Sequence, residues 1–139
     1  YEAGHYGPYA ANLNKVLEVM EGHFIRGYGD CQKPEAEIEL LPGAVDEASA
    51  FLADKRDSLT RLEQVADLIE GFETPYGMEL LATVHWVAHY GGRQGEAPAA
   101  DVDAATNVVH AWNPRKQNIF KPDHIRAAWM QLAQRGWMH

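Results

Sequence analysis

The sequence predicts a mainly α fold of about six helices with one or two short strands. Apolar residues recur at the helical period along most of the chain, and clear start and stop residues bound several of these stretches. Alternation typical of a strand is found only around residues 37–40. The 139 residues, 46% hydrophobic and 23% charged, match one ordinary globular domain that is long enough to bury a core.

The first half of the chain predicts three helices. Periodic apolar residues predict the first from about Ala10 to Phe24, the second over 44–52 and the third over 59–72. Between the first two, Gly27–Asp30 is typical of a loop, and it presents Tyr28 and Asp30.

The strongest helix signal is Glu73–Ala88. Thr74 is a good N-cap, and Pro75 suits the first helical position. One face is an apolar core stripe. A second face carries, at steps of three and four residues, Tyr76, Glu79, Thr83, Trp86 and Tyr90. An acid framed by aromatic rings is either a buried polar lock or part of a recognised surface.

The second half predicts two further helices. Residues 91–100 form a glycine-rich, flexible loop, and a helix over 102–112 follows, with Asp101 as its cap. The last helix begins at Pro122 and stops at Gly136, after which Trp137 can fold back as in a Schellman motif. Two helices followed by Gly-Trp also resemble the helical part of a winged helix.

Charge is unevenly distributed along this chain, whose net charge is −8. Residues 27–80 hold 13 acids and four bases, whereas residues 112–139 hold one acid and five bases. An acidic surface attracts basic partners, including proteins that bind nucleic acid, although it also serves solubility alone. The basic end is a modest patch that disfavours direct DNA binding, but a nucleic-acid-binding regulator stays open as an alternative.

The sequence predicts no catalytic residue, no metal and no cofactor. His85 and His89 have a spacing that can bind zinc, but no third ligand has a recognisable spacing. Cys31 is the only cysteine, which excludes an internal disulfide and is typical of a reducing cytoplasm, where we expect the protein. No run of about 18 apolar residues predicts a membrane span.

Several stretches together are similar to one known family. They are Tyr6–Tyr9, Asn12–Leu17, Glu21–Asp30, Ile38–Ala44, Glu73–Leu81, Val84–Trp86, Phe120–Ile125, Trp129 and Gly136–Trp137. With them the chain resembles the C-terminal domain of DarG, the antitoxin of DarT–DarG toxin–antitoxin systems. The resemblance spans nearly the whole chain except residues 91–100.

The resemblance implies a function. DarT toxins transfer ADP-ribose from NAD onto thymidine in single-stranded DNA. DarG antitoxins remove that group with an N-terminal macrodomain, and their C-terminal domain binds the toxin by imitating its DNA. We therefore expect residues 1–139 to be one non-catalytic, YbiA-like domain that binds a bacterial DarT-like toxin, with the macrodomain outside this chain. A YbiA-like N-glycosidase is the second alternative.

A DNA mimic should offer carboxylates in place of phosphates and aromatic rings in place of bases. The predicted toxin-contact candidates are Tyr6, Tyr9, Tyr28, Asp30, Glu73, Tyr76, Glu79 and Trp86. For each aromatic residue the alternative is a core position with a hydrogen-bonded polar end.

Overall fold

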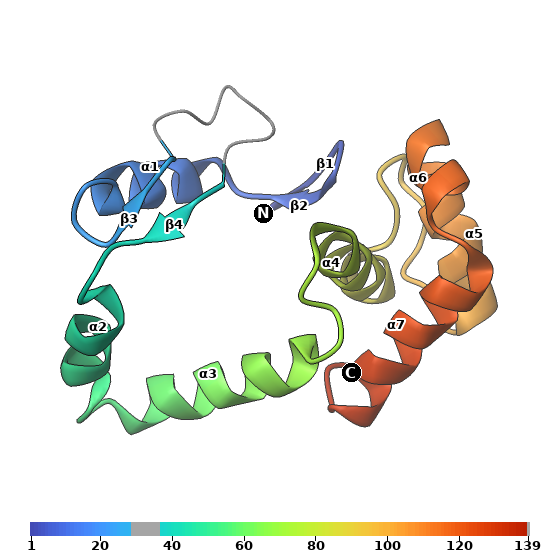
Figure 1. The fold of residues 1–139 in the computed structure, drawn as a ribbon. Coiled ribbons are helices and arrows are strands. Elements are labelled where there is room, and N and C mark those ends of the chain that lie inside the picture. The colour runs from blue at the N-terminus through green and yellow to red at the C-terminus, as the bar shows by residue number, and fades with distance from the viewer. Residues whose placement is uncertain (29–36, 139) are drawn as a thin grey trace. The chain divides into compact units, whose positions relative to one another are not determined.

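The computed structural model describes residues 1–28 and 37–138, which contain seven helices and four short strands and confirm the mainly α prediction (Figure 1). In chain order these are β1 (Glu2–Gly4), β2 (Gly7–Tyr9), α1 (Ala11–Met20), β3 (Ile25–Arg26), β4 (Glu39–Leu40), α2 (Ala44–Leu52), α3 (Arg56–Ile69), α4 (Pro75–Tyr90), α5 (Val102–Trp112), α6 (Pro114–Ile119) and α7 (Pro122–Gln134). The chain divides into two compact units: the first is Tyr1–Tyr9 with Glu63–His139, and the second is Ala10–Leu62.

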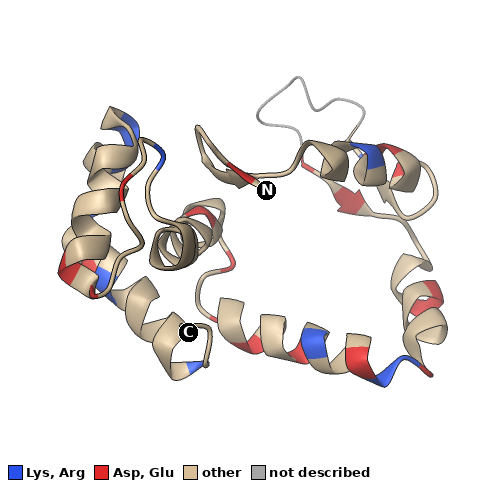
Figure 2. Cartoon of the chain, turned by 180° about the vertical axis from the view of Figure 1, so that it is seen from behind, with Lys and Arg blue, Asp and Glu red and all other residues tan. Residues whose placement is uncertain are grey.

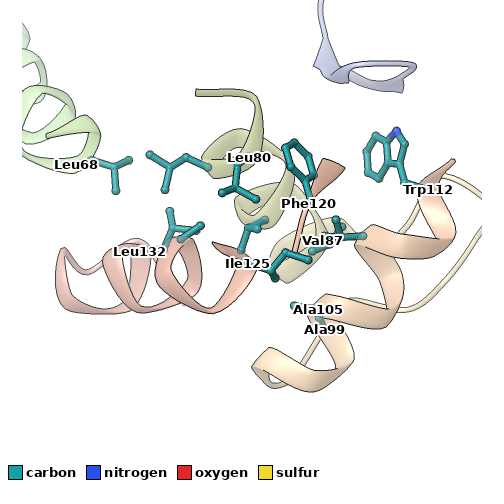
Figure 3. Close-up of a cluster of buried hydrophobic side chains, with 13 residues drawn as sticks. Leu68, Leu80, Val87, Ala99, Ala105, Trp112, Phe120, Ile125 and Leu132 are labelled. Atoms are coloured by element: carbon teal, nitrogen blue, oxygen red, sulfur yellow. The ribbon is translucent and has the colours of Figure 1, made fainter. Parts of the chain in front are cut away.

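The hydrophobic core of the first unit lies where α4, α5 and α7 pack together (Figure 3). Val87, Trp112, Phe120 and Leu132 are all almost completely buried there. Burying a side chain of this size stabilises a fold by about 1.5–3 kcal/mol relative to leaving it exposed. This core therefore holds α4 rigidly, and α4 carries three of the eight candidate contact residues, Tyr76, Glu79 and Trp86.

Helix α4 begins as its sequence predicts. The Thr74 hydroxyl accepts a hydrogen bond from Gly77 N at 3.0 Å, and Pro75 is the first helical residue. A Cβ at position 77 would lie 2.7 Å from the carbonyl oxygen of Phe72. Glycine therefore lets the first turn of α4 pack directly on the preceding backbone.

The α5–α6 corner contains a helix that the sequence pattern does not predict. Helix α5 is capped as expected, with Asp101 accepting from Ala104 N at 2.8 Å. Asn113 then caps the unpredicted α6 by accepting from Lys116 N at 2.8 Å, and Pro114 is its first residue. Six residues are too few to show a helical period, which is why α6 escapes detection.

Helix α7 ends in the predicted Schellman motif. Gly136 has a φ of +76°, Trp137 N donates to Leu132 O at 2.8 Å, and Gly136 N donates to Ala133 O at 3.2 Å. This turn directs Trp137 back toward the core, against which it packs.

The N-terminal hairpin is also absent from the prediction. Strands β1 and β2 pair antiparallel, with Glu2 opposite Tyr9 and Gly4 opposite Gly7. Three residues per strand carry too little alternation to be recognised in the sequence.

The second unit contains α1, the β3–β4 pair and α2. Helix α1 ends at Met20 instead of the predicted Phe24, because Glu21 is extended and Gly22 turns the chain with a φ of +79°. Of the strand predicted at 37–40, only Glu39 and Leu40 pair, with Arg26 and Ile25.

The predicted loop at residues 91–100 returns the chain to the core of the first unit. Gly92 N donates to Glu96 O at 3.0 Å, and Ala99 N donates to Val87 O at 2.9 Å. Ala99 is consequently buried beside α4.

Candidate interaction site

Glu79 lies at the centre of an ionic cluster that joins α4 to α6. Its carboxylate accepts two hydrogen bonds from the Arg115 guanidinium, at 2.6 and 3.0 Å, and one from Lys116 Nζ at 2.7 Å. The Lys116 side chain is 0% exposed and that of Glu79 is 16% exposed. Because a buried ammonium group is costly without an anion, Glu79 is the group that permits Lys116 to lie inside the fold.

The buried ammonium group of Lys116 has three acceptors. Besides Glu79, Nζ donates to Thr83 Oγ1 and to the Tyr6 carbonyl oxygen, both at 3.1 Å. Thr83 in turn donates to the Glu79 carbonyl oxygen at 2.7 Å. All three ammonium hydrogens are thus used, so the cluster is a satisfied polar network.

Side chains of the α5–α6 corner hold the N-terminal hairpin by three consecutive carbonyl groups. Trp112 Nε1 donates to Gly4 O at 2.8 Å, and Asn113 Nδ2 donates to His5 O at 2.9 Å. Lys116 makes the third bond, to Tyr6 O. Residues 112, 113 and 116 therefore fix the backbone that presents the Tyr6 ring.

The pKa values of the cluster reflect burial opposed by pairing. Burial raises the pKa of Glu79, but hydrogen bonds from Arg115 and Lys116 outweigh it, so that pKa lies below its ordinary value. Burial lowers the pKa of Lys116, and Glu79 partly opposes that shift. The hydrogen bond to Glu79 raises the pKa of Arg115. Glu79 is therefore ionised at neutral pH.

The ionic cluster brings two of the predicted contact residues, Tyr6 and Glu79, into one place. The Arg115 guanidinium carbon lies 4.8 Å from the centre of the Tyr6 ring, and Tyr6 is 65% exposed. Arg115 connects the two because it binds the acid and stacks on the ring. At this site the aromatic group faces solvent and the carboxylate lies beneath it.

Tyr76 contacts the α6–α7 junction. Its hydroxyl donates to Ile119 O at 3.0 Å and lies 2.7 Å from His124 Nδ1, and its ring meets Phe120 edge-on at 5.2 Å. Burial raises the pKa of Tyr76, and the negative charge of Glu79 adds to the shift.

The other aromatic and acidic candidates of the first unit have separate surroundings. Trp86 is partly buried, and its ring contacts that of Tyr90 at a tilt of 40°, with 4.6 Å between ring centres. Glu73 is exposed and accepts a hydrogen bond from Gly71 N at 2.8 Å. Tyr9 lies on β2 and is 44% exposed. The stripe along α4 therefore divides into several local contacts.

Two predicted contact residues lie in the Gly27–Asp30 stretch of the second unit. The Tyr28 hydroxyl donates to Asn14 Oδ1 at 3.0 Å, and the backbone N–H groups of Gly27 and Tyr28 donate to the Glu21 carboxylate at 3.1 and 3.0 Å. Asp30 lies outside the described residues.

Arg115 and Lys116 are the members of the ionic cluster that the sequence does not single out, because it shows them only as part of the basic C-terminal patch. One signal does distinguish Lys116. It follows Trp112 by four residues and precedes Phe120 by four, and both of these aromatic residues are buried. Trp112 ends α5 and Phe120 follows α6, and the fold places both rings near Lys116 Nζ, at 5.7 and 4.9 Å. Only a paired cation is tolerated in such apolar surroundings.

Exposed acidic residues lie on α2, on α3 and directly after α3 (Figure 2). They are Asp46, Glu47, Asp57, Glu63, Asp67 and Glu70. Among the described residues, no three or more His, Cys, Asp or Glu side chains come together as a metal ion requires. None of the helices seen in residues 1–28 and 37–138 is long and apolar enough to cross a membrane.

Comparison with known proteins links the chain to one group of enzymes. It is 44% identical over 131 residues to a DNA ADP-ribosyl glycohydrolase of Thermus aquaticus, a match that covers 94% of this chain and 34% of that protein. The chain is homologous to part of the DNA ADP-ribosyl glycohydrolases. Those of Mycobacterium bovis and Mycobacterium tuberculosis are each 35% identical over 134 residues, which is 92% of this chain and 36% of theirs. The chain thus spans about a third of the length of these relatives, and no family model matches it.

Proposed function

We propose that this chain is the toxin-binding part of a DarG-type antitoxin. In this proposal it is a non-catalytic module that binds a DarT-like DNA ADP-ribosyltransferase and occupies its groove for single-stranded DNA. The observation that carries the proposal is the 44% identity over 94% of the chain to only about a third of a DNA ADP-ribosyl glycohydrolase. The glycohydrolase activity would then reside in a macrodomain elsewhere in the parent protein.

The charge distribution supports the mimicry. A groove that binds single-stranded DNA carries cations for phosphates and surfaces on which bases stack. The exposed acids of α2 and α3 offer carboxylates to such cations, while four bases among residues 27–80 oppose 13 acids. Their attraction would be electrostatic, so binding should weaken as salt increases.

Glu79 takes a different part in this proposal from the one first expected. Since its carboxylate is engaged by Arg115 and Lys116, it would act as a positioning residue that orients Arg115 beneath Tyr6. The exposed ring of Tyr6 would then be the group that touches the toxin. Tyr9 and Glu73 are further exposed contact candidates in the same unit.

No specific observation favours either alternative function, the nucleic-acid-binding regulator or the N-glycosidase. A winged-helix-like regulator would use the basic C-terminal residues on nucleic acid, but Lys116 is buried and Arg115 is paired with Glu79. Helix α6 also intervenes between the two helices that suggested a winged helix. Nothing in the geometry favours an N-glycosidase.

Direct titration tests the proposal. A catalytically inactive DarT-like toxin, single-stranded DNA and duplex DNA are each titrated into the chain by isothermal calorimetry. The proposal requires tight binding of the toxin and none of either DNA. Binding of DNA without binding of the toxin refutes it and favours the regulator.

A further inference from the structure

Two hollows in the first unit adjoin, because both are lined by His85 and Trp137. The larger has a volume of about 410 Å³ and is otherwise lined by polar groups of Gln64, His89, Arg135 and Gly136. The smaller has a volume of about 160 Å³, and its other lining residues are apolar. Leu68 and Leu132, at the α3 end of the core in Figure 3, lie on its wall.

The fold fixes the two shared rings. The Schellman turn at Gly136 positions Trp137, whose ring meets that of His85 edge-on at 6.0 Å. His89 Nε2 lies 2.9 Å from the Trp137 carbonyl oxygen, so this nitrogen must carry the hydrogen. His89 thus uses its Nε2 hydrogen on the backbone that follows α7.

The charge of the polar hollow is opposite to that of the chain. None of its six lining residues is acidic, although the chain has 20 acids, and Arg135 supplies a permanent positive charge. The Arg135 side chain is 40% exposed, and its contact with Glu70 is long, at 3.4 Å. Such a contact is weak, so the guanidinium can turn toward a ligand. The His85 imidazole and the Gln64 amide add N–H groups that can donate hydrogen bonds to an oxyanion.

The apolar hollow determines which uncharged group the ligand carries. Its volume of about 160 Å³ is close to the ~150 Å³ of an apolar cavity that holds one benzene ring. A neutral His85 at the boundary suits this environment, since burial lowers its pKa, with His89 adding to the shift. The combination of an apolar recess and a few convergent polar groups is typical of small-molecule sites.

We propose that the two hollows form one binding site for a small anionic aromatic compound, with its ring in the apolar hollow and its phosphate or carboxylate against Arg135, His85 and Gln64. The inference is independent of toxin binding, because it concerns a different set of residues on α3, α4 and the end of α7. It assigns to the first unit a ligand site in addition to its contact surface.

Phenyl phosphate is the probe, followed by the indole N–H signals of the four tryptophans in proton–nitrogen NMR spectra. Trp137→Phe identifies the signal of Trp137. The expected result is a saturable shift of that signal with phenyl phosphate, and a smaller response to phenylacetate, whose anionic group carries less charge. Inorganic phosphate and benzyl alcohol, each holding half of the ligand chemistry, should bind at least about tenfold more weakly.

Two matched pairs of variants test the two halves of the site. Arg135→Gln should weaken phenyl phosphate binding about tenfold, as loss of one charge-assisted hydrogen bond implies, while Arg126→Gln on the same helix should not. Ala82→Leu should fill the apolar hollow and block binding, while Ala127→Leu on the exposed side of α7 should not. Circular dichroism verifies that each variant is folded.

Two results would overturn the proposal. One is no shift of the Trp137 signal at saturating phenyl phosphate. The other is equal binding of inorganic phosphate together with no effect of Ala82→Leu, because Arg135 would then be attracting an anion with no aromatic site beside it.

Discussion

At the scale of single residues, one buried lysine organises the candidate site. Lys116 has no exposed surface, yet its ammonium group is fully hydrogen-bonded by Glu79, Thr83 and the Tyr6 carbonyl. A network of this kind fixes geometry strongly, because any partner left unpaired in the interior is costly. Loss of the Glu79 carboxylate should therefore disturb every contact of the cluster.

Glu79→Gln should lower the free energy of unfolding by about 3 kcal/mol, because it leaves the Lys116 ammonium buried without an anion. Urea denaturation measures the change. Glu39→Gln is the matched control, since its ion pair with Arg26 is exposed on both sides and should contribute less than about 1 kcal/mol. Adding Lys116→Met to Glu79→Gln should restore part of the loss, and strict additivity of the two changes would contradict the network.

The same residue should make stability depend on pH. The pKa of Glu79 is lower in the folded chain than its ordinary value, so its contribution is complete above the unfolded pKa of about 4.3 and disappears as the pH falls through the folded value. The stability difference between the wild-type chain and Glu79→Gln should thus be large at pH 7 and shrink below about pH 4. A difference that stays constant across this range would show that Glu79 does not act through its charge.

At the scale of elements, local signals and distant contacts differ in how well they can be predicted. The starts of α4 and α5 follow from Thr74 and Asp101, because a side-chain cap involves residues three positions apart. The start of α7 follows from Pro122, whose fixed φ suits the first helical position. The hairpin attachment does not follow, because Trp112 and Gly4 are 108 positions apart and only the folded core brings them together. Helix α6 escapes prediction because it is so short.

Asn113 tests how the hairpin is joined to α6, because its side chain caps α6 and also holds His5. Asn113→Ala should lose both bonds and about 2 kcal/mol, whereas Asn113→Asp should keep the cap and lose only the bond to the hairpin, at about 1 kcal/mol. Hydrogen exchange should then quicken at the β1 and β2 amides in both variants but in α6 only for Asn113→Ala.

Asn118→Ala, on the exposed side of the same helix, is the control for these two variants. It should leave exchange unchanged in both elements. Equal exchange in β1 and β2 for Asn113→Asp and the wild-type chain would mean that Asn113 does not hold the hairpin.

At the scale of the whole molecule, the uneven distribution of charge is the property that can be predicted most directly from the sequence. It predicted acidic surface in the middle of the chain, and exposed carboxylates occur there on α2 and on α3. It could not predict which acids pair internally, because opposite charges such as Glu79 and Arg115 are 36 positions apart in the chain. The acids that remain exposed are the ones available to a partner.

Charge reversal on α3 tests whether its exposed acids contribute to toxin binding more than exposed acids elsewhere in the chain. Glu63→Lys and Asp67→Lys together should weaken toxin binding on the order of tenfold at low salt, mainly by slowing association, because they oppose the cations of a DNA groove. Asp103→Lys is the control, because this acid is 87% exposed but lies on α5, outside the acidic segment. Surface plasmon resonance measures the association rates. Equal effects of Glu63→Lys/Asp67→Lys and of Asp103→Lys would indicate a general charge effect.

Competition for the toxin's DNA groove tests the central claim most directly. A fluorescent single-stranded oligonucleotide is bound to a catalytically inactive DarT-like toxin, and the chain is added while anisotropy is recorded. The proposed mimicry predicts complete, saturable displacement of the oligonucleotide, with a higher chain concentration needed for Glu63→Lys/Asp67→Lys. A toxin that binds the chain and the oligonucleotide at the same time would contradict it.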